Sequence, residues 1–184
     1  MNTIIFCPHQ DDEILSSFLL ISRLRESGEH VTIVFATNGD YHGKALAKIR
    51  YMESVQALSF CHIEQADIIY MGYGDTGMRR DHSFLNRLYH ADMEQPFSSG
   101  CSTYTYHPAD LKTLHHMLFR EDVSYTKAHF IDDLNAIFHM LAPDRLIVPS
   151  ILDEHGDHHA LAKFICQAAP ELYYKAYFYM IHSG

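Results

Sequence analysis

Residues 7–13, Cys7-Pro8-His9-Gln10-Asp11-Asp12-Glu13, join two patterns that decide the fold of this chain. Before them, residues 3–7 form a short run with apolar side chains on both faces, which is typical of a strand buried in a parallel sheet. After them, apolar residues recur at helical spacing, namely Ile14, Phe18, Leu19, Ile21 and Leu24. The stretch is therefore predicted to be the turn at the carboxyl end of a strand. In an open parallel α/β sheet, ligands bind at that edge.

The same turn concentrates negative charge. One histidine, His9, and three carboxylates, Asp11, Asp12 and Glu13, lie within five residues, and such carboxylates repel one another unless a cation lies among them. A divalent metal fits, with a neutral imidazole and one carboxylate as ligands and the neighbouring carboxylate free to handle a proton. This stretch alone leaves open a polar loop with an acidic helix start, since Asp and Glu are favoured near a helix N-terminus.

Strands and helices are predicted to alternate along the rest of the chain. Further strands are predicted at residues 30–36, 67–71, 144–149 and 173–181, and helices at 45–60, 130–141 and 158–168. In the helix at 45–60, Ile49, Met52, Val55 and Leu58 are the expected core positions. This alternation predicts an α/β fold, a single-domain Rossmann-like three-layer sandwich over residues 1–184 with a mostly parallel sheet of about five strands.

Residues 79–122 interrupt this alternation with polar and aromatic residues that lack a clear period. We expect an irregular excursion over the carboxyl edge of the sheet, with short helices near 85–90 and 109–119. His82 and His107 lie in it and could reach the site, because functional residues often lie on loops.

Composition limits the classes of partner. The net charge of −9 argues against nucleic acid or an anionic membrane as the main partner. No apolar stretch is long enough to span a bilayer, and the chain opens directly into a strand rather than a targeting segment. The cysteines Cys7, Cys61, Cys101 and Cys166 are scattered, which indicates reduced thiols and predicts a cytoplasmic protein.

A second polar motif follows the predicted strand at 144–149. It reads Asp153-Glu154-His155-Gly156-Asp157-His158, and it meets the first motif if the first and fourth strands are neighbours, at the point where strand order reverses. Its two histidines offer one metal ligand and one nearby proton donor. Together with His9 and Asp12 they give a His, Asp and His ligand set with an open position, which is the pattern of catalytic rather than structural zinc.

These paired motifs resemble the LmbE-like, or PIG-L-type, zinc N-deacetylases, whose signatures are a His-Pro-Asp-Asp-Glu turn and a His-Pro-Asp-His turn. Three further stretches agree in order and position over residues 2–168, namely Thr37-Asn38-Gly39, Arg50-x-x-Glu53 and Gly72-Tyr73-Gly74-Asp75-Thr76-Gly77-Met78. Both motif prolines are replaced, by Gln10 and Gly156, which we expect to loosen the turns without removing a ligand. The chain also ends soon after its last predicted strand, so we expect a part of the pocket wall to be missing or supplied by a partner.

The resemblance implies roles for the residues that match the family motifs. His9, Asp12 and His158 match the ligands of Zn2+, with another divalent metal such as Fe2+ as an alternative. Asp11 matches the general base.

The same resemblance implies that His155 stabilises the oxyanion as an imidazolium and that Asp157 orients a neighbouring histidine. Arg50 and Asp75 match positions that bind sugar hydroxyls. Taken alone, Arg50 and Glu53 would be a surface pair on a helix, and Asp75 a turn residue.

The expected function is therefore removal of the N-acetyl group from an N-acetylglucosamine-type glycoside or glycoconjugate, a small amino-sugar substrate. Two alternatives remain: hydrolysis of another amide or ester at the same site, and a carbohydrate-binding module without turnover. The presence of Asp11 and His155 argues against the second, because binding alone does not need them. A homo-oligomer is also compatible with the sequence.

Overall fold

A computed structural model describes residues 1–183 and shows one five-stranded sheet in the order β3-β2-β1-β4-β5. The strands are β1 (Asn2–Cys7), β2 (His30–Thr37), β3 (Ile68–Tyr73), β4 (Arg145–Pro149) and β5 (Tyr177–Tyr179). The α-helices are α1 (Asp12–Glu26), α2 (Lys44–Ser59), α3 (Phe84–His90), α4 (Leu114–Phe119), α5 (Lys127–Leu141), α6 (Gly156–Ala168) and α7 (Pro170–Tyr173), and one 3-10 turn, η1, covers Gln65–Asp67. The predicted α/β fold is confirmed, and all of its strand pairs are parallel.

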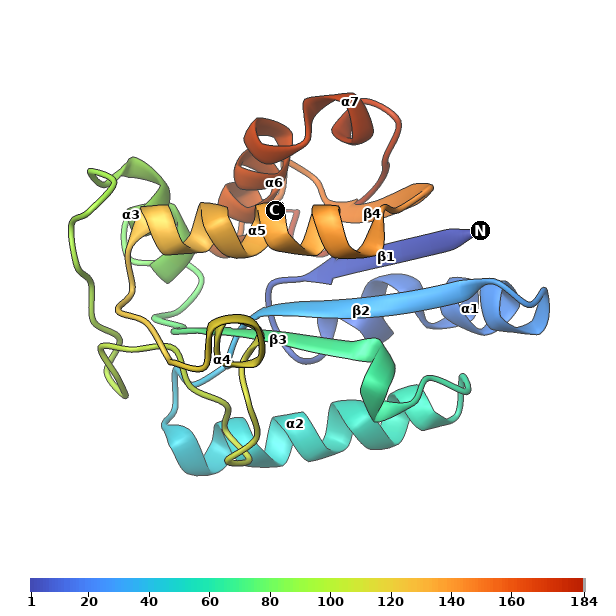
Figure 1. The fold of residues 1–184 in the computed structure, drawn as a ribbon, viewed down its shortest axis with the longest axis horizontal. Coiled ribbons are helices and arrows are strands. Elements are labelled where there is room, and N and C mark those ends of the chain that lie inside the picture. Colours follow the sequence, from blue (N-terminus) through green and yellow to red (C-terminus); the bar gives the residue numbers. More distant parts are fainter. Residues whose placement is uncertain (184) are drawn as a thin grey trace.

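The sheet separates two layers of helices (Figure 1). Alternate side chains of one strand point to opposite faces, so Ile5 of β1 packs in the cluster with Ile21 of α1 and Leu58 of α2. Ile4, its neighbour in the chain, packs instead with Leu134 of α5 and residues of α6. The central strands are thus covered on both faces, which explains why their sequences are apolar without alternation.

The central strand pair places the two polar motifs at one edge. β1 pairs in parallel with β2 on one side and with β4 on the other, with Ile5 opposite Ile147 in the second pair. The prediction that the first and fourth strands are neighbours is therefore confirmed. Strand order reverses between them, and the turns that follow both strands meet at the carboxyl edge of the sheet.

Several predicted core positions were wrong. Of the four predicted core positions of α2, Ile49 and Met52 are exposed, whereas Leu58 is buried. Leu19, one of the apolar residues at helical spacing in α1, is also exposed. The buried face of α2 is formed by Ala47, Tyr51, Ser54 and Leu58, which recur every three or four residues and lie on one side of the helix. Apolar residues on both sides of α2 conceal this face in the sequence.

Two predicted elements were too long. The chain at 173–181 is not a continuous strand, because α7 ends at Tyr173 and β5 covers only Tyr177–Tyr179 on the sheet edge. The helix expected at 109–119 begins only at Leu114. Asp110 has a φ of 57°, outside the helical region, and the Thr113 side chain accepts a hydrogen bond from the His116 amide as an N-cap.

The excursion at 79–122 contains α3, which packs against α6, and α4, which packs against β3, while residues 79–82 and 92–96 are exposed. Phe84 and Leu88 of α3 are fully buried. His107 also lies in the core, with its ring 4.5 Å from that of Tyr70, and burial lowers its pKa to about 4. It therefore does not reach the carboxyl-edge cavity described below.

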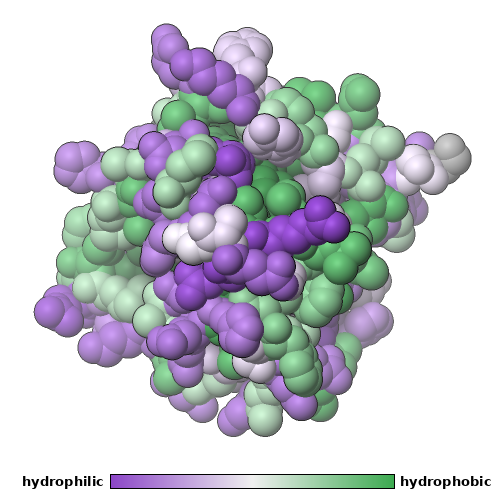
Figure 2. Space-filling model, turned by 90° about the vertical axis from the view of Figure 1, so that its right-hand side faces the viewer, coloured by the Kyte–Doolittle hydropathy of each residue, from purple (hydrophilic) through white to green (hydrophobic). Residues whose placement is uncertain are grey.

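The amino-terminal edge of the sheet, opposite the carboxyl edge, has a surface with both hydrophilic and hydrophobic residues. Figure 2 shows the side of the molecule that lies at the right of Figure 1, near the start of β1, where hydrophilic and hydrophobic residues are interspersed. Among residues 1–183, no helix has the length and apolar character needed to cross a membrane.

The packing of α5 on the sheet predicts a clear difference between two leucines. Leu134→Ala removes a fully buried side chain of this layer, so the free energy of unfolding should fall by about 2–5 kcal/mol. Leu19→Ala changes a side chain that is 76% exposed and should shift it by less than about 0.5 kcal/mol. Chemical denaturation of both variants measures this, and equal effects would contradict the assignment of the core.

Candidate active site

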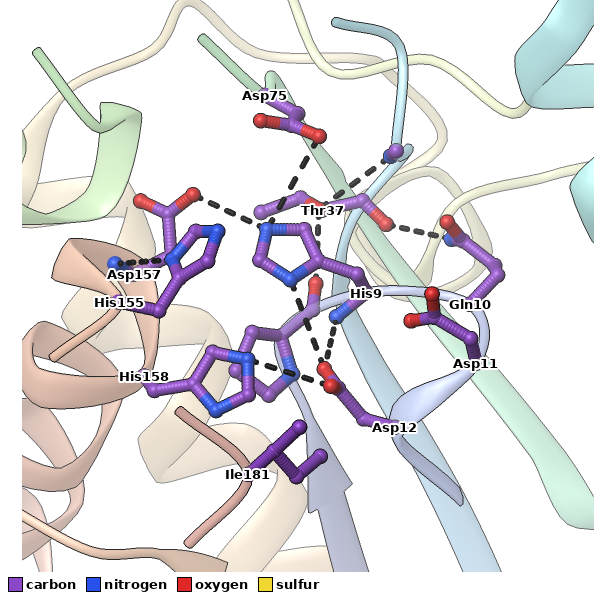
Figure 3. A network of polar contacts seen from close by, with 12 residues as sticks. His9, Gln10, Asp11, Asp12, Thr37, Asp75, His155, Asp157, His158 and Ile181 are labelled. Carbon is purple, nitrogen blue, oxygen red and sulfur yellow. Dashed lines mark hydrogen bonds and ion pairs between the residues drawn. The ribbon is translucent and has the colours of Figure 1, made fainter. Parts of the chain in front are cut away.

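A cavity of about 770 Å3 opens at the carboxyl edge of the sheet. Six of the predicted site residues line it: His9, Asp11, Asp12, Arg50, Asp75 and His155. Asp157 and His158 lie behind them, fully buried, and contact His9 and Asp12 (Figure 3). The structure therefore brings all of the predicted site residues together, from turns and helices that are far apart in the sequence.

The turn after β1 is fixed to the end of β2. The Pro8 carbonyl accepts hydrogen bonds from the amide and the hydroxyl of Thr37, at 3.0 and 2.7 Å. The Gln10 amide nitrogen donates to the Thr37 carbonyl at 2.7 Å. Gln10 thus ties this turn to the sheet through a side-chain hydrogen bond, where the family signature has a proline.

Asp11 has a strained backbone. Its φ is 154°, a value that residues other than glycine rarely adopt, and its amide donates to Glu13 Oε2 at 3.0 Å. Its side chain is 56% exposed toward the cavity and lies 3.2 Å from Arg50 Nη2. Burial and the nearby Asp12 raise the pKa of Asp11, and Arg50 opposes that rise. Strain of this kind is concentrated at functional sites.

Asp12 lies between two histidines. Its Oδ2 accepts a hydrogen bond from the His9 amide at 2.8 Å and lies 3.5 Å from His9 Nδ1, while its Oδ1 lies 3.2 Å from His158 Nε2. Burial alone would raise the pKa of Asp12, but the two imidazoles outweigh it and hold the pKa well below its usual value. Asp12 is therefore ionised, and each of its two carboxylate oxygens faces a different imidazole.

Asp157 supports His9 from the other side. Its Oδ2 lies 3.1 Å from His9 Nε2, and its Oδ1 accepts a hydrogen bond from the Leu85 amide at 2.7 Å. Burial would lower the pKa of His9, but Asp75, Asp12 and Asp157 together raise it well above the usual value. This pocket favours a positive charge at the position of His9.

His155 is a neutral imidazole in this arrangement. Its Nδ1 accepts a hydrogen bond from the Asp157 amide at 3.2 Å, so the ring proton lies on Nε2. Burial, followed by the charges of His9 and His158, lowers its pKa to about 2. This differs from the expected imidazolium, because the sequence does not reveal how completely the ring is buried. A neutral ring still donates one hydrogen bond through Nε2–H.

Arg50 and Asp75 both face the cavity but are held differently. Arg50 donates to the carbonyls of Gln10 and Gly39, at 2.9 and 3.4 Å, in addition to its contact with Asp11. Asp75 accepts from the Gly77 amide at 2.8 Å, and its other oxygen lies 3.9 Å from His9 Nε2. Arg50 therefore anchors the turn that carries Asp11, and Asp75 borders the histidine cluster.

The donor set fits a divalent cation. Within residues 1–183, three groups have donor atoms within 4.8 Å of one another: His9–His155–His158, Asp153–His158–His182 and His9–Asp75–Asp157. None of them is the predicted set of His9, Asp12 and His158, although the first contains both of its histidines. Both ring nitrogens of His158 are buried and make no hydrogen bond, although Asp12 and Asp153 lie 3.2 Å from them. Buried nitrogens next to carboxylates, in a pocket that favours positive charge, suit a metal ion.

Two residues of this site were missed by the sequence analysis. Asp153 is fully buried beside His158, and His182, in the segment after β5, lines the cavity. Asp153 belongs to the second polar motif, so its place beside His155 and His158 in the sequence could have assigned it to the site. Nothing around His182 in the sequence indicates a site. The remaining lining residues are Leu15, Tyr41, His42, Thr76, Gly77, Met78, Arg79, His82 and Arg87.

The fold and this cluster define an α/β protein with a group of histidines and aspartates that could hold a metal ion at the carboxyl edge of its sheet. The chain belongs to the GlcNAc-PI de-N-acetylase (PIG-L) family, whose model matches residues 4–169. The family predicted from the paired motifs is thereby confirmed. No curated protein sequence matches the chain.

Solved structures share the fold at low sequence identity. A deacetylase of the teicoplanin biosynthetic pathway has a TM-score of 0.60 and 13% identity to this chain. The match covers 93% of this chain and 60% of the deacetylase. N,N′-diacetylchitobiose deacetylase from Pyrococcus horikoshii has a TM-score of 0.57 and 18% identity, with 95% and 53% coverage. The A40926 pseudoaglycone deacetylase has a TM-score of 0.57 and 15% identity, with 92% and 59% coverage. The chain thus spans between 53% and 60% of the length of these structures.

Gly156 replaces the second motif proline, and a substitution there tests how tightly the start of α6 packs against the loop before α3. A Cβ at Gly156 would lie 2.8 Å from Arg80 Cα, so Gly156→Ala should lower the free energy of unfolding by about 1–3 kcal/mol. Gly100 has open space around it, and Gly100→Ala should change stability by less than about 0.5 kcal/mol. Thermal or chemical unfolding compares the two. A Gly156→Ala variant as stable as the parent would show that the 80–83 loop can move away from α6.

Proposed function

We propose that this protein is a metal-dependent N-deacetylase that removes the acetyl group from an N-acetylglucosamine-type glycoside or glycoconjugate. The observation that carries the proposal is the position of Asp12, which joins His9 and His158 behind a cavity that the exposed carboxylate of Asp11 faces. Three donors beside a further carboxylate, that of Asp11, give the composition of a hydrolytic metal site rather than of a closed structural one.

His9, Asp12 and His158 would hold the metal, with zinc as the preferred ion. When bound, a divalent ion polarises a carbonyl group and lowers the pKa of a coordinated water. The proposal is supported by family membership and by structural relatives described as deacetylases. One relative was solved in a zinc-inhibited form, which speaks for zinc binding in that protein and not for turnover with zinc. Asp157 holds the His9 ring in place through Nε2, as carboxylates commonly do for ligating histidines.

Asp11 and His155 would divide the proton chemistry. Asp11 accepts a proton from the attacking water and returns it to the leaving amine, and its raised pKa suits both transfers. His155 donates its Nε2–H to the amide oxygen as negative charge develops there. A neutral donor needs no additional proton from solvent, which agrees with the buried position of this ring.

Arg50 and Asp75 would bind the sugar. A guanidinium and a carboxylate at the cavity wall can make charge-assisted hydrogen bonds to vicinal hydroxyls. Arg50 would have a second task, since it contacts Asp11 and holds the turn that carries it. Substrate binding and placement of the base would then share one side chain.

A screen of N-acetylated amino sugars for acetate release, with zinc or iron supplied, tests the function directly. Turnover of N-acetylglucosaminides supports the proposal. Turnover only of unrelated amides or esters would favour the broader hydrolase. Sugar binding without turnover would favour a carbohydrate-binding module.

Asp11→Asn should separate proton transfer from metal binding. The variant keeps the metal ligands, so metal content should stay at the parent value while kcat falls by about 10²–10⁴-fold. His158→Ala should instead lose both metal and activity. Metal analysis together with steady-state kinetics measures the two effects, and near-normal turnover by Asp11→Asn would show that another group is the base.

Arg50→Ala and Asp75→Ala should weaken sugar capture with metal content unchanged. Loss of a hydrogen bond to a charged group should reduce kcat/KM on N-acetylglucosamine compounds by about 1.5–3 kcal/mol in transition-state stabilisation. Arg50→Ala should also lower kcat, because Asp11 loses its partner. If both variants cleave sugar substrates normally, the cavity is not a sugar site and the broader amide-hydrolase function should replace this proposal.

A further inference from the structure

The segment after β5 is fixed to the site by one buried carboxylate. Asp153 Oδ2 accepts hydrogen bonds from the amides of Ile181 and His182, at 2.9 and 3.3 Å. Its Oδ1 accepts from the His155 amide at 2.9 Å, and the Glu154 amide donates to the His182 carbonyl at 3.1 Å. These bonds join the turn after β4 to residues 181–182.

The same carboxylate orients His182. Nδ1 of His182 lies 3.3 Å from Asp153 Oδ1 without forming a hydrogen bond, so Nε2 is on the side of the ring away from this carboxylate. The ring lies 5.1 Å from that of His155 and 4.9 Å from that of His158, and the side chain is 32% exposed. His182 therefore forms part of the cavity wall. It lies next to His155, the candidate oxyanion donor, and His158, a candidate metal ligand.

The order of the strands shows which side of the cavity His182 borders. Asp75 follows β3, which is one edge of the sheet, and His182 follows β5, which is the other. His9 follows β1 in the middle. In the proposed reaction the amide carbon lies at the central cluster and the sugar extends toward Arg50 and Asp75. The alkyl part of the acyl group, which is bonded to that carbon opposite the sugar nitrogen, then extends toward His182.

We infer that His182 is a specificity-determining residue that borders the acyl side of the pocket and restricts the acyl group to a short one such as acetyl, with Asp153 as its positioning residue. This inference rests on the proposed deacetylase function. The backbone of His182 is held by the hydrogen bonds that its own amide and that of Ile181 donate to Asp153. Its imidazole ring packs against those of His155 and His158. The ring therefore limits space where a longer acyl chain would continue. Binding pockets discriminate single methylene groups in this way.

The test compares kcat/KM for N-acetyl- and N-butyrylglucosaminides in the zinc-supplied full chain. The parent should prefer acetyl, and His182→Ala should raise the butyryl-to-acetyl ratio by about tenfold or more. His182→Phe, which keeps a ring at this position, should retain the preference for acetyl. Met180→Ala changes an exposed residue of the same segment that does not line the cavity, and should leave the ratio unchanged.

Zinc content is measured on each variant, because Asp153, His158 and His182 also form a possible ligand group. Loss of zinc in His182→Ala would show that His182 is a ligand and would overturn the inference. So would an unchanged acyl ratio, or a parent that cleaves both substrates equally. A parent that releases no acyl group from any sugar refutes the proposed function itself, and the inference with it.

Asp153→Asn tests the positioning role. The amide oxygen can replace only part of the five contacts that the carboxylate makes. The acyl ratio should shift toward butyryl, in the direction of His182→Ala, and hydrogen exchange at Ile181 and His182 should accelerate. Faster exchange with an unchanged acyl ratio would show that the segment is only structural.

Discussion

The carboxylate of Asp12 joins the two halves of this site. It accepts the His9 amide from within its own turn and lies next to His158 Nε2 from α6. The contact exists only because β1 and β4 are parallel neighbours, so that the turns after both strands meet at one edge. A buried carboxylate costs free energy unless it is compensated, and the two imidazoles provide that compensation.

The sequence was sufficient to predict the features that depend on local pattern. Buried strands are apolar runs, and polar turns at their carboxyl ends converge in any parallel sheet, so the positions of His9, Asp12, Asp75 and His158 followed. Features that depend on tertiary packing could not be predicted from the sequence. The buried face of α2 is hidden by apolar residues on its other side, and the neutral state of His155 depends on burial by residues distant in the chain.

The two replaced prolines show how one turn geometry can be held in different ways. At Gln10 a side-chain amide binds the end of β2, and this bond fixes the turn next to the strained backbone of Asp11. At Gly156 the lack of a side chain lets the loop before α3 pack against the start of α6. Rigidity is thus supplied by neighbouring elements, so the polar side chains remain in place although the ring constraint is absent.

The separation of His9 and Asp12 from His158 along the chain has a thermodynamic consequence. In the unfolded protein these donors do not form a preformed site, because only the pairing of β1 with β4 brings their turns together. An ion that prefers the assembled donors binds the native state alone, and its binding free energy is added to that of folding through linkage. For the proposed metal, the free energy of unfolding would then rise with the concentration of free ion in the surroundings.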